Sequence, residues 1–278
     1  MVSERSFRSF QLLKKNVEIN NVDAECYNES FESIVSRYHF DFIDVDPYGS
    51  VVPYVDIALN HIKNKGYIGF TATDLSVLTG SIAEKNLRRY ETQIPNNHLR
   101  HELGIRNLLG FIARRASVLD CGMYPVVSLW KGHYYRIIVK IIKSVEAASE
   151  SISNVGKVNL FELKDIIYPD QKIGLLWLGN LCPFLSENSF VYPQSINKET
   201  VTILDSLRYE DMEFLFTDLS ESFSRRKINL PSMEKIKEVA EKNSIGMQRT
   251  HFSPTGFKSD DPRELLRLIL ESASLEHS

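Results

Sequence analysis

One segment constrains the fold more than any other: the apolar run from Phe40 to Val45, which ends in Asp46-Pro47-Tyr48-Gly49. Aromatic and aliphatic residues in a run of this length predict a strand that stops at a turn. Pro53 then lies where a helix begins, and residues 67–73 form the next β-rich run. Strand, helix and strand in this order predict an α/β fold with a mostly parallel sheet.

The neighbouring segments continue this alternation. Helical spacing of apolar residues predicts an amphipathic helix over residues 5–19 and a strong helix over residues 105–116. Gly66 is placed to end the helix after the turn in a left-handed conformation. Residues 124–130 and 134–143 are β-rich runs around a short turn, which predicts a hairpin that forms one antiparallel edge of the sheet.

Two stretches break the pattern. Residues 74–104 are long and mostly polar, which favours a functional loop or lid. Residues 144–159 carry Ser, Glu and Ala with little periodicity, so we place a domain boundary near residue 150. The expected domains are residues 1–150 and residues 151–278.

The second expected domain mixes helices with short strands. Apolar spacing predicts one helix over residues 231–243. Another helix should open at Asp261-Pro262-Arg263-Glu264, because Asp261 can cap it, Pro262 suits its first position and Glu264 completes a capping box. We therefore expect an α+β arrangement in this part of the chain.

Composition narrows the class of protein. The 278 residues carry 33 Lys or Arg against 36 Asp or Glu, so any contact with nucleic acid has to be a local patch. Three distant cysteines argue against a zinc cluster or a disulfide framework and favour a reducing cytoplasm. No apolar run approaches the roughly 20 residues that a membrane helix needs. We expect a cytoplasmic protein without metal or membrane partners.

The turn after Val45 carries groups suited to methylation of an exocyclic amine. A carboxylate and a backbone carbonyl accept hydrogen bonds from such an amine and stabilise the charge that develops on its nitrogen. Asp46 would hold the amine, Pro47 would fix the carbonyl, and Tyr48 would offer a ring to an unstacked base. The plainer interpretation is an Asp-Pro-x-Gly turn that only ends a strand. A matching strand end at residues 71–74 favours the site.

Several ordered segments resemble one known family, the S-adenosylmethionine-dependent tRNA (guanine-26-N2)-dimethyltransferases. The segments are residues 42–50, 71–74, 99–106, 133–136, 174–179 and 249–260. In one of them the family usually has Cys-His-Glu followed by Gly-x-Arg, and Arg100 replaces the Cys here. The matches cover both expected domains.

The resemblance implies a fold and an activity. The fold is a Rossmann-like class I methyltransferase domain that lacks its first strand and helix, followed by a tRNA-binding α+β domain. The activity is transfer of one or two methyl groups from S-adenosylmethionine to the N2 amine of guanine-26 in tRNA. Asp46, Pro47 and Tyr48 would be catalytic, Thr73 and Asp74 would line the same site, and Asp44 would support it on the cofactor side.

Few residues of this sequence match the part of the family's site that binds the methyl donor. The first glycine is Gly49, so no glycine-rich loop precedes the motif. The resemblance places Glu4 where an acid binds the cofactor ribose and Glu29 where an acid meets the adenine amine; both are otherwise ordinary surface charges. It also places the family's first strand and methionine-binding loop upstream of Met1. We therefore expect a truncated chain that binds S-adenosylmethionine poorly by calorimetry.

A local basic patch is the expected tRNA contact. Residues 84–115 contain seven Lys or Arg residues and only three acidic residues. Such an excess of positive charge suits phosphate binding, and it is also compatible with an ordinary solvated surface. We assign to tRNA binding the residues Arg88, Arg89, Arg100, His101, Arg106, Arg249, His251 and Lys258. His101 and His251 are alternatively structural.

Other functions stay open at this point. A noncatalytic tRNA-binding relative would keep the RNA surface and lack the donor site. A methyltransferase for another base or for DNA would share the motif, although residues 249–260 resemble the second domain of the tRNA enzymes. The sequence also leaves the oligomeric state open.

Overall fold

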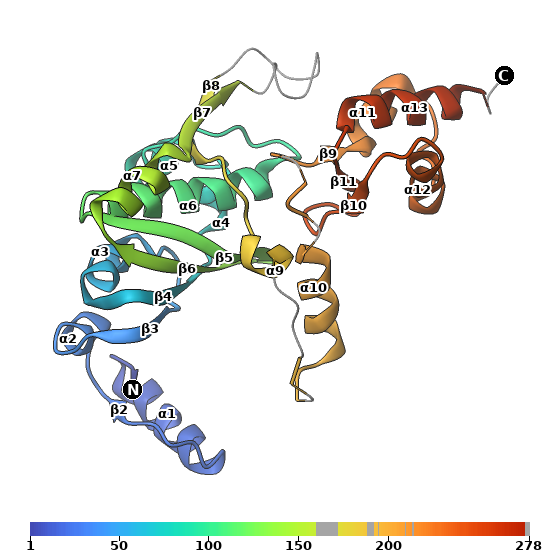
Figure 1. Ribbon diagram of the computed structural model, residues 1–278. Coiled ribbons are helices and arrows are strands. Elements are labelled where there is room, and N and C mark those ends of the chain that lie inside the picture. The colour runs from blue at the N-terminus through green and yellow to red at the C-terminus, as the bar shows by residue number, and fades with distance from the viewer. Residues whose placement is uncertain (160–171, 188–191, 194, 209, 213, 276–278) are drawn as a thin grey trace.

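The computed structural model describes residues 1–159, 172–187, 192–193, 195–208, 210–212 and 214–275. A four-stranded sheet lies at its centre, and a smaller unit of helices and short strands follows at the C-terminal end (Figure 1). The strands of the central sheet are β3 (Phe40–Val45), β4 (Ile62–Ala72), β5 (Cys121–Lys131) and β6 (Tyr134–Lys143).

The central sheet has the strand order β3-β4-β6-β5. β3 and β4 are parallel, and β6 is antiparallel to both of its neighbours. The predicted hairpin is confirmed, but its antiparallel strand is not at the edge. β6 lies inside the sheet because its apolar residues Ile137, Val139 and Ile141 are fully buried there, and β5 forms the edge.

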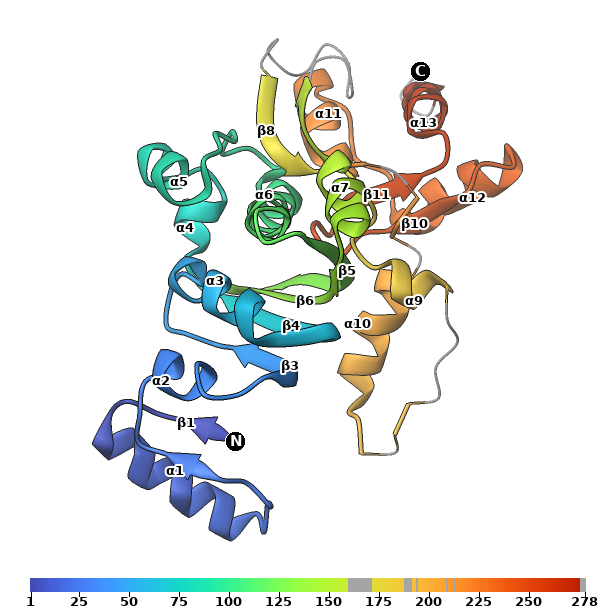
Figure 2. The same cartoon turned by 60° about the vertical axis from the view of Figure 1, so that its left-hand side comes forward.

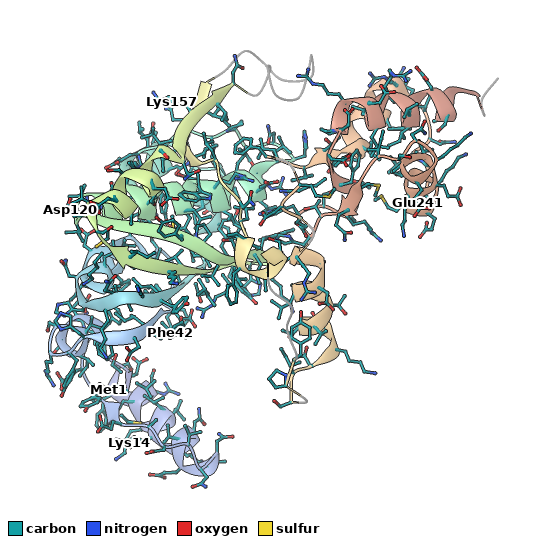
Figure 3. All side chains as sticks on the ribbon, viewed as in Figure 1. Met1, Lys14, Phe42, Asp120, Lys157 and Glu241 are labelled. Carbon is teal, nitrogen blue, oxygen red and sulfur yellow. The ribbon has the colours of Figure 1, made fainter. Side chains whose placement is uncertain are left out.

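Helices cover one face of the central sheet, as Figure 2 shows. They are α3 (Val52–His61), α6 (Arg100–Ser117) and α7 (Val145–Ser153). Alternate residues of β3 and β4, such as Val45 and Phe70, are buried on this side. Phe42, labelled on β3 in Figure 3, alternates with them and is 49% exposed.

The junction between α3 and β4 differs from the prediction. α3 ends at His61 and β4 begins directly at Ile62, so Gly66 lies within the strand. Lys65, not Gly66, takes a positive φ of 67°. A Cβ on Gly66 would lie 3.0 Å from the carbonyl oxygen of Asp41, so the glycine allows close approach of β3 and does not end a helix.

The N-terminal elements form a sheet of their own. β1 (Val2–Ser3) pairs in parallel with β2 (Cys26–Tyr27), and α1 (Phe7–Ile19) connects them. α1 confirms the helix expected over residues 5–19, and none of its residues is buried. α2 (Phe31–Val35) leads on to β3, and within the described residues no strand pairing joins β1 or β2 to the central sheet.

The stretch from residue 74 to residue 104 is not the long loop that we expected. It folds into α4 (Leu75–Leu78), α5 (Ala83–Tyr90) and the first turn of α6. Its few apolar residues anchor it, because Leu78, Tyr90 and Leu99 are fully buried in the core of the sheet unit.

The C-terminal part contains a hairpin, a second small sheet and five helices within the described residues. The hairpin consists of β7 (Val155–Asn159) and β8 (Lys172–Trp177), and the three-stranded antiparallel sheet consists of β9 (Thr217–Asp218), β10 (Met247–Arg249) and β11 (Gly256–Ser259). The helices are α9 (Pro183–Glu187), α10 (Lys198–Arg208), α11 (Leu219–Arg226), α12 (Met233–Lys242) and α13 (Pro262–Leu275). In the described part of the chain, no helix has the length and apolar character to span a bilayer.

Two apolar cores are present. The larger core lies under the central sheet and reaches Leu185, Leu207 and Phe216, whereas the smaller one joins α11, α12, β11 and α13. The boundary that we place near residue 150 falls within α7, and it stays a proposal. The segment that suggested it is ordered into α7 and β7.

The start of α13 follows the predicted chemistry in two of its three features. The capping box is not formed, because the Asp261 N–H donates to the Ser259 hydroxyl at 3.2 Å and the Glu264 carboxylate pairs with Arg267. Pro262 is the first residue of the helix, and the backbone N–H of Glu264 donates to the Asp261 carboxylate at 3.2 Å. α12 likewise confirms the helix expected over residues 231–243, with the Ser232 hydroxyl accepting from Lys235 N. Capping residues thus predicted the start of α13, whereas α12 was predicted from its apolar spacing.

At Gly110, α6 touches the backbone of β8. A Cβ there would lie 2.7 Å from the carbonyl oxygen of Leu175 and 3.1 Å from the backbone nitrogen of Trp177. We expect Gly110→Ala to reduce the free energy of unfolding by about 1–3 kcal/mol, because β8 has to move away from the helix. Urea unfolding measures this loss.

Gly132→Asn is the matched control for Gly110→Ala. Gly132 has a φ of 56° in the hairpin turn, and a Cβ there meets no atom within 4 Å. Asn adopts this left-handed conformation readily, so the control should change stability by less than about 0.5 kcal/mol. Equal stability of the Gly110→Ala protein and the wild type would contradict the close contact.

Candidate active site

The Asp46-Pro47-Tyr48-Gly49 segment forms a loop at the carboxyl end of β3. Gly49 has a φ of 102°, a conformation that side chains other than glycine rarely adopt. The loop turns sharply there, and it leaves the side chains of Asp46 and Tyr48 exposed. Both side chains are thus available to a substrate, with Tyr48 fully open to solvent.

The loop is held by the end of β4. The backbone N–H of Gly49 donates to the Thr73 hydroxyl at 2.7 Å, and the Thr73 N–H donates to the Gly49 carbonyl at 3.0 Å. Because β3 and β4 are adjacent parallel strands, their carboxyl ends meet at this edge of the sheet. Thr73 therefore contributes to the site by fixing the backbone of the loop.

Asp74 lies beside Thr73 and is nearly buried. Its carboxylate accepts hydrogen bonds from Arg89 Nη1 at 3.0 Å and from the Tyr90 hydroxyl at 3.0 Å. Asp74 and Arg89, which we expected to contact substrate, thus bind each other. Tyr90 was missed by sequence reasoning, although it is the one aromatic residue in the charged segment of α5.

Asp44 lies on the sheet face opposite the helices. Its carboxylate accepts a hydrogen bond from Arg136 Nη1 at 2.6 Å, and the same nitrogen donates to the Thr71 hydroxyl at 2.9 Å. These contacts cross from β3 over β4 to β6 and are half exposed. They fix the Asp44 carboxylate two residues before Asp46, at the end of β3.

Glu4 and Glu29 follow the paired strands β1 and β2. Their loops are tied together, because the Asn28 amide donates to the carbonyl oxygens of Glu4 at 2.8 Å and Arg5 at 3.2 Å. The Glu4 carboxylate accepts from the Ser6 N–H. Hydrogen bonds from Ser33 and then from Arg37 lower the pKa of Glu29, so its carboxylate is ionised and already partnered.

Arg106 and Lys258 are not on the surface. Both are buried, and they donate to the same carboxylate oxygen of Glu102, at 2.8 Å from Arg106 Nη2 and 2.9 Å from Lys258 Nζ. The other oxygen accepts from the Phe216 N–H at 3.0 Å. Phosphates do not reach these cations, so we replace the predicted tRNA contacts with a structural role. We call Glu102, Arg106 and Lys258 the buried ion cluster.

His101 and His251 meet at Trp130. The His101 ring stacks on the Trp130 indole, with centroids 3.8 Å apart, while the backbone N–H of Trp130 donates to His251 Nε2 at 3.0 Å. His251 Nδ1 therefore carries the proton, which it donates to Glu210 at 2.8 Å. Burial, with the charge of Arg100, lowers the pKa of His101 to about 4, so it is neutral. His251 therefore ties the C-terminal segment to the hairpin, whereas His101 packs the start of α6 against it.

Much of the predicted basic patch is neutralised by acids. Four of its seven cations form ion pairs, namely Arg89 with Asp74, Arg106 with Glu102, Arg114 with Glu91 and Arg115 with Asp56. Arg88, Arg100 and Arg249 have exposed side chains. Among the assigned residues, these three arginines are classed as exposed, whereas Arg89 is partly exposed and already paired with Asp74.

Comparison with known proteins identifies the family. The family described as N2,N2-dimethylguanosine tRNA methyltransferase matches residues 2–271, which is nearly the whole chain and includes the loop of Asp46. The chain belongs to this family. The resemblance read from the motifs is thereby confirmed.

Relatives within the N2,N2-dimethylguanosine tRNA methyltransferase family are similar over nearly the whole chain. The tRNA (guanine(26)-N(2))-dimethyltransferase of Thermoplasma volcanium is 39% identical over 98% of this chain and 78% of that protein. The enzyme of the same name from Thermoplasma acidophilum is 38% identical over 97% of this chain and 76% of that protein.

A solved structure of the family shares the fold. The structure of Trm1 from Pyrococcus horikoshii with S-adenosyl-L-methionine matches with a TM-score of 0.81 and 27% identity. The match covers 96% of this chain and 80% of that one. The expected fold class, a Rossmann-like methyltransferase domain with a C-terminal α+β domain, is therefore confirmed.

Proposed function

We propose that this chain is a tRNA methyltransferase that adds one or two methyl groups to the N2 amine of guanine-26. Its relatives carry that name, and the structural relative was solved with S-adenosyl-L-methionine. The observation that carries the proposal is the loop of Asp46 to Gly49, whose backbone is fixed by Thr73 while its acid and aromatic side chains are exposed. We place the activity in the cytoplasm.

The loop activates the amine by accepting hydrogen bonds from its two N–H groups. The Asp46 carboxylate and the carbonyl of Pro47 each accept one N–H, which orients the nitrogen lone pair and stabilises the positive charge that forms on it. The proton leaves after the methyl group arrives, so no strong general base is needed. Tyr48 provides a ring against which the extruded guanine stacks.

The acids after β1 and β2 fit the methyl donor. S-adenosylmethionine supplies an electrophilic methyl group when bound. Glu4 and Glu29 sit on loops tied by Asn28, and carboxylates accept hydrogen bonds from ribose hydroxyls and an adenine amine. Glu4 would take the ribose and Glu29 the amine, while Asp44, held by Arg136, keeps the end of β3 in place.

The exposed arginines suit the tRNA backbone. Arg88 on α5, Arg100 at the start of α6 and Arg249 on β10 present guanidinium groups to solvent. Such groups bind phosphates bidentately and make affinity dependent on salt. We propose that residues 1–150 carry the transfer site and that residues 151–278 add to tRNA binding.

A transfer assay tests the proposed function. The chain is incubated with radiolabelled S-adenosylmethionine and two tRNA transcripts that differ only in guanine or adenine at position 26. We expect label in N2-methylguanosine and N2,N2-dimethylguanosine from the first transcript and none from the second. Binding of both transcripts without transfer to either would identify a noncatalytic tRNA-binding protein.

Arg88→Ala and Arg100→Ala should each weaken tRNA binding. Each change removes one phosphate contact, so the slope of log affinity against log salt should fall by about one. Filter binding at several salt concentrations measures both quantities. Arg267→Ala is the control, because Arg267 pairs with Glu264 on α13, and its slope should equal that of the wild type. Unchanged slopes in all three variants would remove these arginines from the interface.

A further inference from the structure

The Asp46 loop has a second anchor besides Thr73. Ser50 is the residue after the motif, and its hydroxyl lies 2.9 Å from the Tyr90 hydroxyl. That hydroxyl lies in turn 3.0 and 3.1 Å from the two carboxylate oxygens of Asp74. Residues from the loop, from α5 and from the end of β4 thus meet at one buried phenol.

The direction of each hydrogen bond from Asp74 through Tyr90 and Ser50 is determined. A carboxylate only accepts, so Tyr90 donates its single proton to Asp74. Tyr90 then accepts from Ser50, and the Ser50 oxygen accepts from the backbone N–H of Val52 at 3.4 Å. Burial and the charge of Asp74 raise the pKa of Tyr90, so the phenol keeps its proton. This series of hydrogen bonds is continuous from the Asp74 carboxylate to Val52, the first residue of α3.

The contacts around the phenol make it rigid. Tyr90 is fully buried, and its ring packs edge-on against Phe111 of α6, with centroids 5.5 Å apart. The charge of Asp74 is balanced by Arg89 at 3.0 Å. Asp74 therefore has a partner even without the Tyr90 hydroxyl, whereas Ser50 relies on that hydroxyl as its acceptor.

We propose that Tyr90 is a positioning residue for the transfer reaction, which holds the catalytic loop through Ser50 while its ring anchors α5 in the core. This inference rests on the proposed function. Tyr90 touches neither the amine nor the methyl donor; it fixes the backbone on which Asp46 and Pro47 present their acceptors. A displacement of about 1 Å at such a site slows a reaction by up to about 100-fold.

Tyr90→Phe tests the inference because it removes only the oxygen. With tRNA in a steady-state transfer assay we expect kcat to fall about 10- to 100-fold and KM for tRNA to stay within about twofold. Ser50→Ala should give the same split, Ser50→Thr should restore most of kcat, and the double variant should be no slower than either single one. Equal kcat in Tyr90→Phe and wild type, or multiplied losses in the double variant, would overturn the proposal.

Tyr124→Phe is the matched control. Tyr124 also loses a hydroxyl bonded to a carboxylate, that of Glu150 at 2.7 Å, but on α7 and β5 away from the loop. Its kcat should equal that of the wild type. A second readout does not need activity: amide hydrogen exchange at residues 49–52 should be faster in Tyr90→Phe than in wild type. Unchanged exchange overturns the positioning role, whereas an inactive wild type with faster exchange in the variant overturns only the proposed function.

Discussion

Replacing Asp46 by Ala should slow methyl transfer about 100- to 1000-fold while tRNA binding stays close to that of the wild type. In the proposed mechanism the carboxylate is the charged acceptor for the amine, and loss of one such preorganised group at a reaction centre has an effect of this size. Asp46 is exposed, so its removal leaves the fold intact. Single-turnover rates and tRNA affinities measured on the same preparation separate the two effects.

Asp41→Ala is the control for that variant. Asp41 lies on β3, the strand that leads into the Asp46 loop, and is exposed, but its carboxylate pairs with Lys63 at 2.9 Å. Its loss should change neither rate nor affinity, because an exposed ion pair contributes little. If Asp46→Ala transferred methyl groups as fast as Asp41→Ala, the acceptor role of the acid would be refuted.

Glu102→Gln should reduce the free energy of unfolding by about 3–5 kcal/mol. The change leaves the buried cations of Arg106 and Lys258 without their counter-charge, and an unpaired buried charge is costly. Glu264→Gln is the control, since its carboxylate pairs with Arg267 on the surface, where an ion pair contributes little to stability. Chemical unfolding of both variants measures the difference, and similar losses would contradict a central role for the cluster.

The same carboxylate gives stability a defined pH dependence. Burial alone raises the pKa of Glu102, but the charges of Lys258 and Arg106 outweigh burial and lower the pKa to about 2. A lowered pKa stabilises the folded state above the ordinary value of 4.5, and this contribution is lost as the pH falls through about 2. Between these pH values the wild type should lose stability more steeply than Glu102→Gln.

Local patterns predicted the elements that position the site. The strand from Phe40 to Val45, the helix after the turn and the hairpin around Gly132 follow from short-range periodicity and turn residues. The capping residues at Asp261 likewise act within one turn of helix. These features need no knowledge of distant segments, because their causes lie within a few residues.

Long-range pairing limited the prediction of the site residues. Whether a basic side chain faces RNA depends on which acid the fold brings to it, and Lys258 meets Glu102 from 156 residues away. Arg89 is neutralised by Asp74 across the start of α5 in the same way. Charge counts along the sequence therefore overestimated the number of basic residues available to RNA. The burial of Tyr90 could not be predicted from the sequence for the same reason.

The buried contacts of the C-terminal unit also fix the distance between two exposed arginines, Arg88 and Arg249. Lys258 docks on α6 and His251 on β5 through polar groups that lose their partners if the unit shifts. Arg88 belongs to the sheet unit and Arg249 to the C-terminal unit. The contacts between the two units therefore hold these arginines at a fixed distance from each other. An RNA that contacts both arginines must therefore have its binding groups at the same distance from each other. The folded shape of the RNA, and not a movement of the protein, then decides whether it binds.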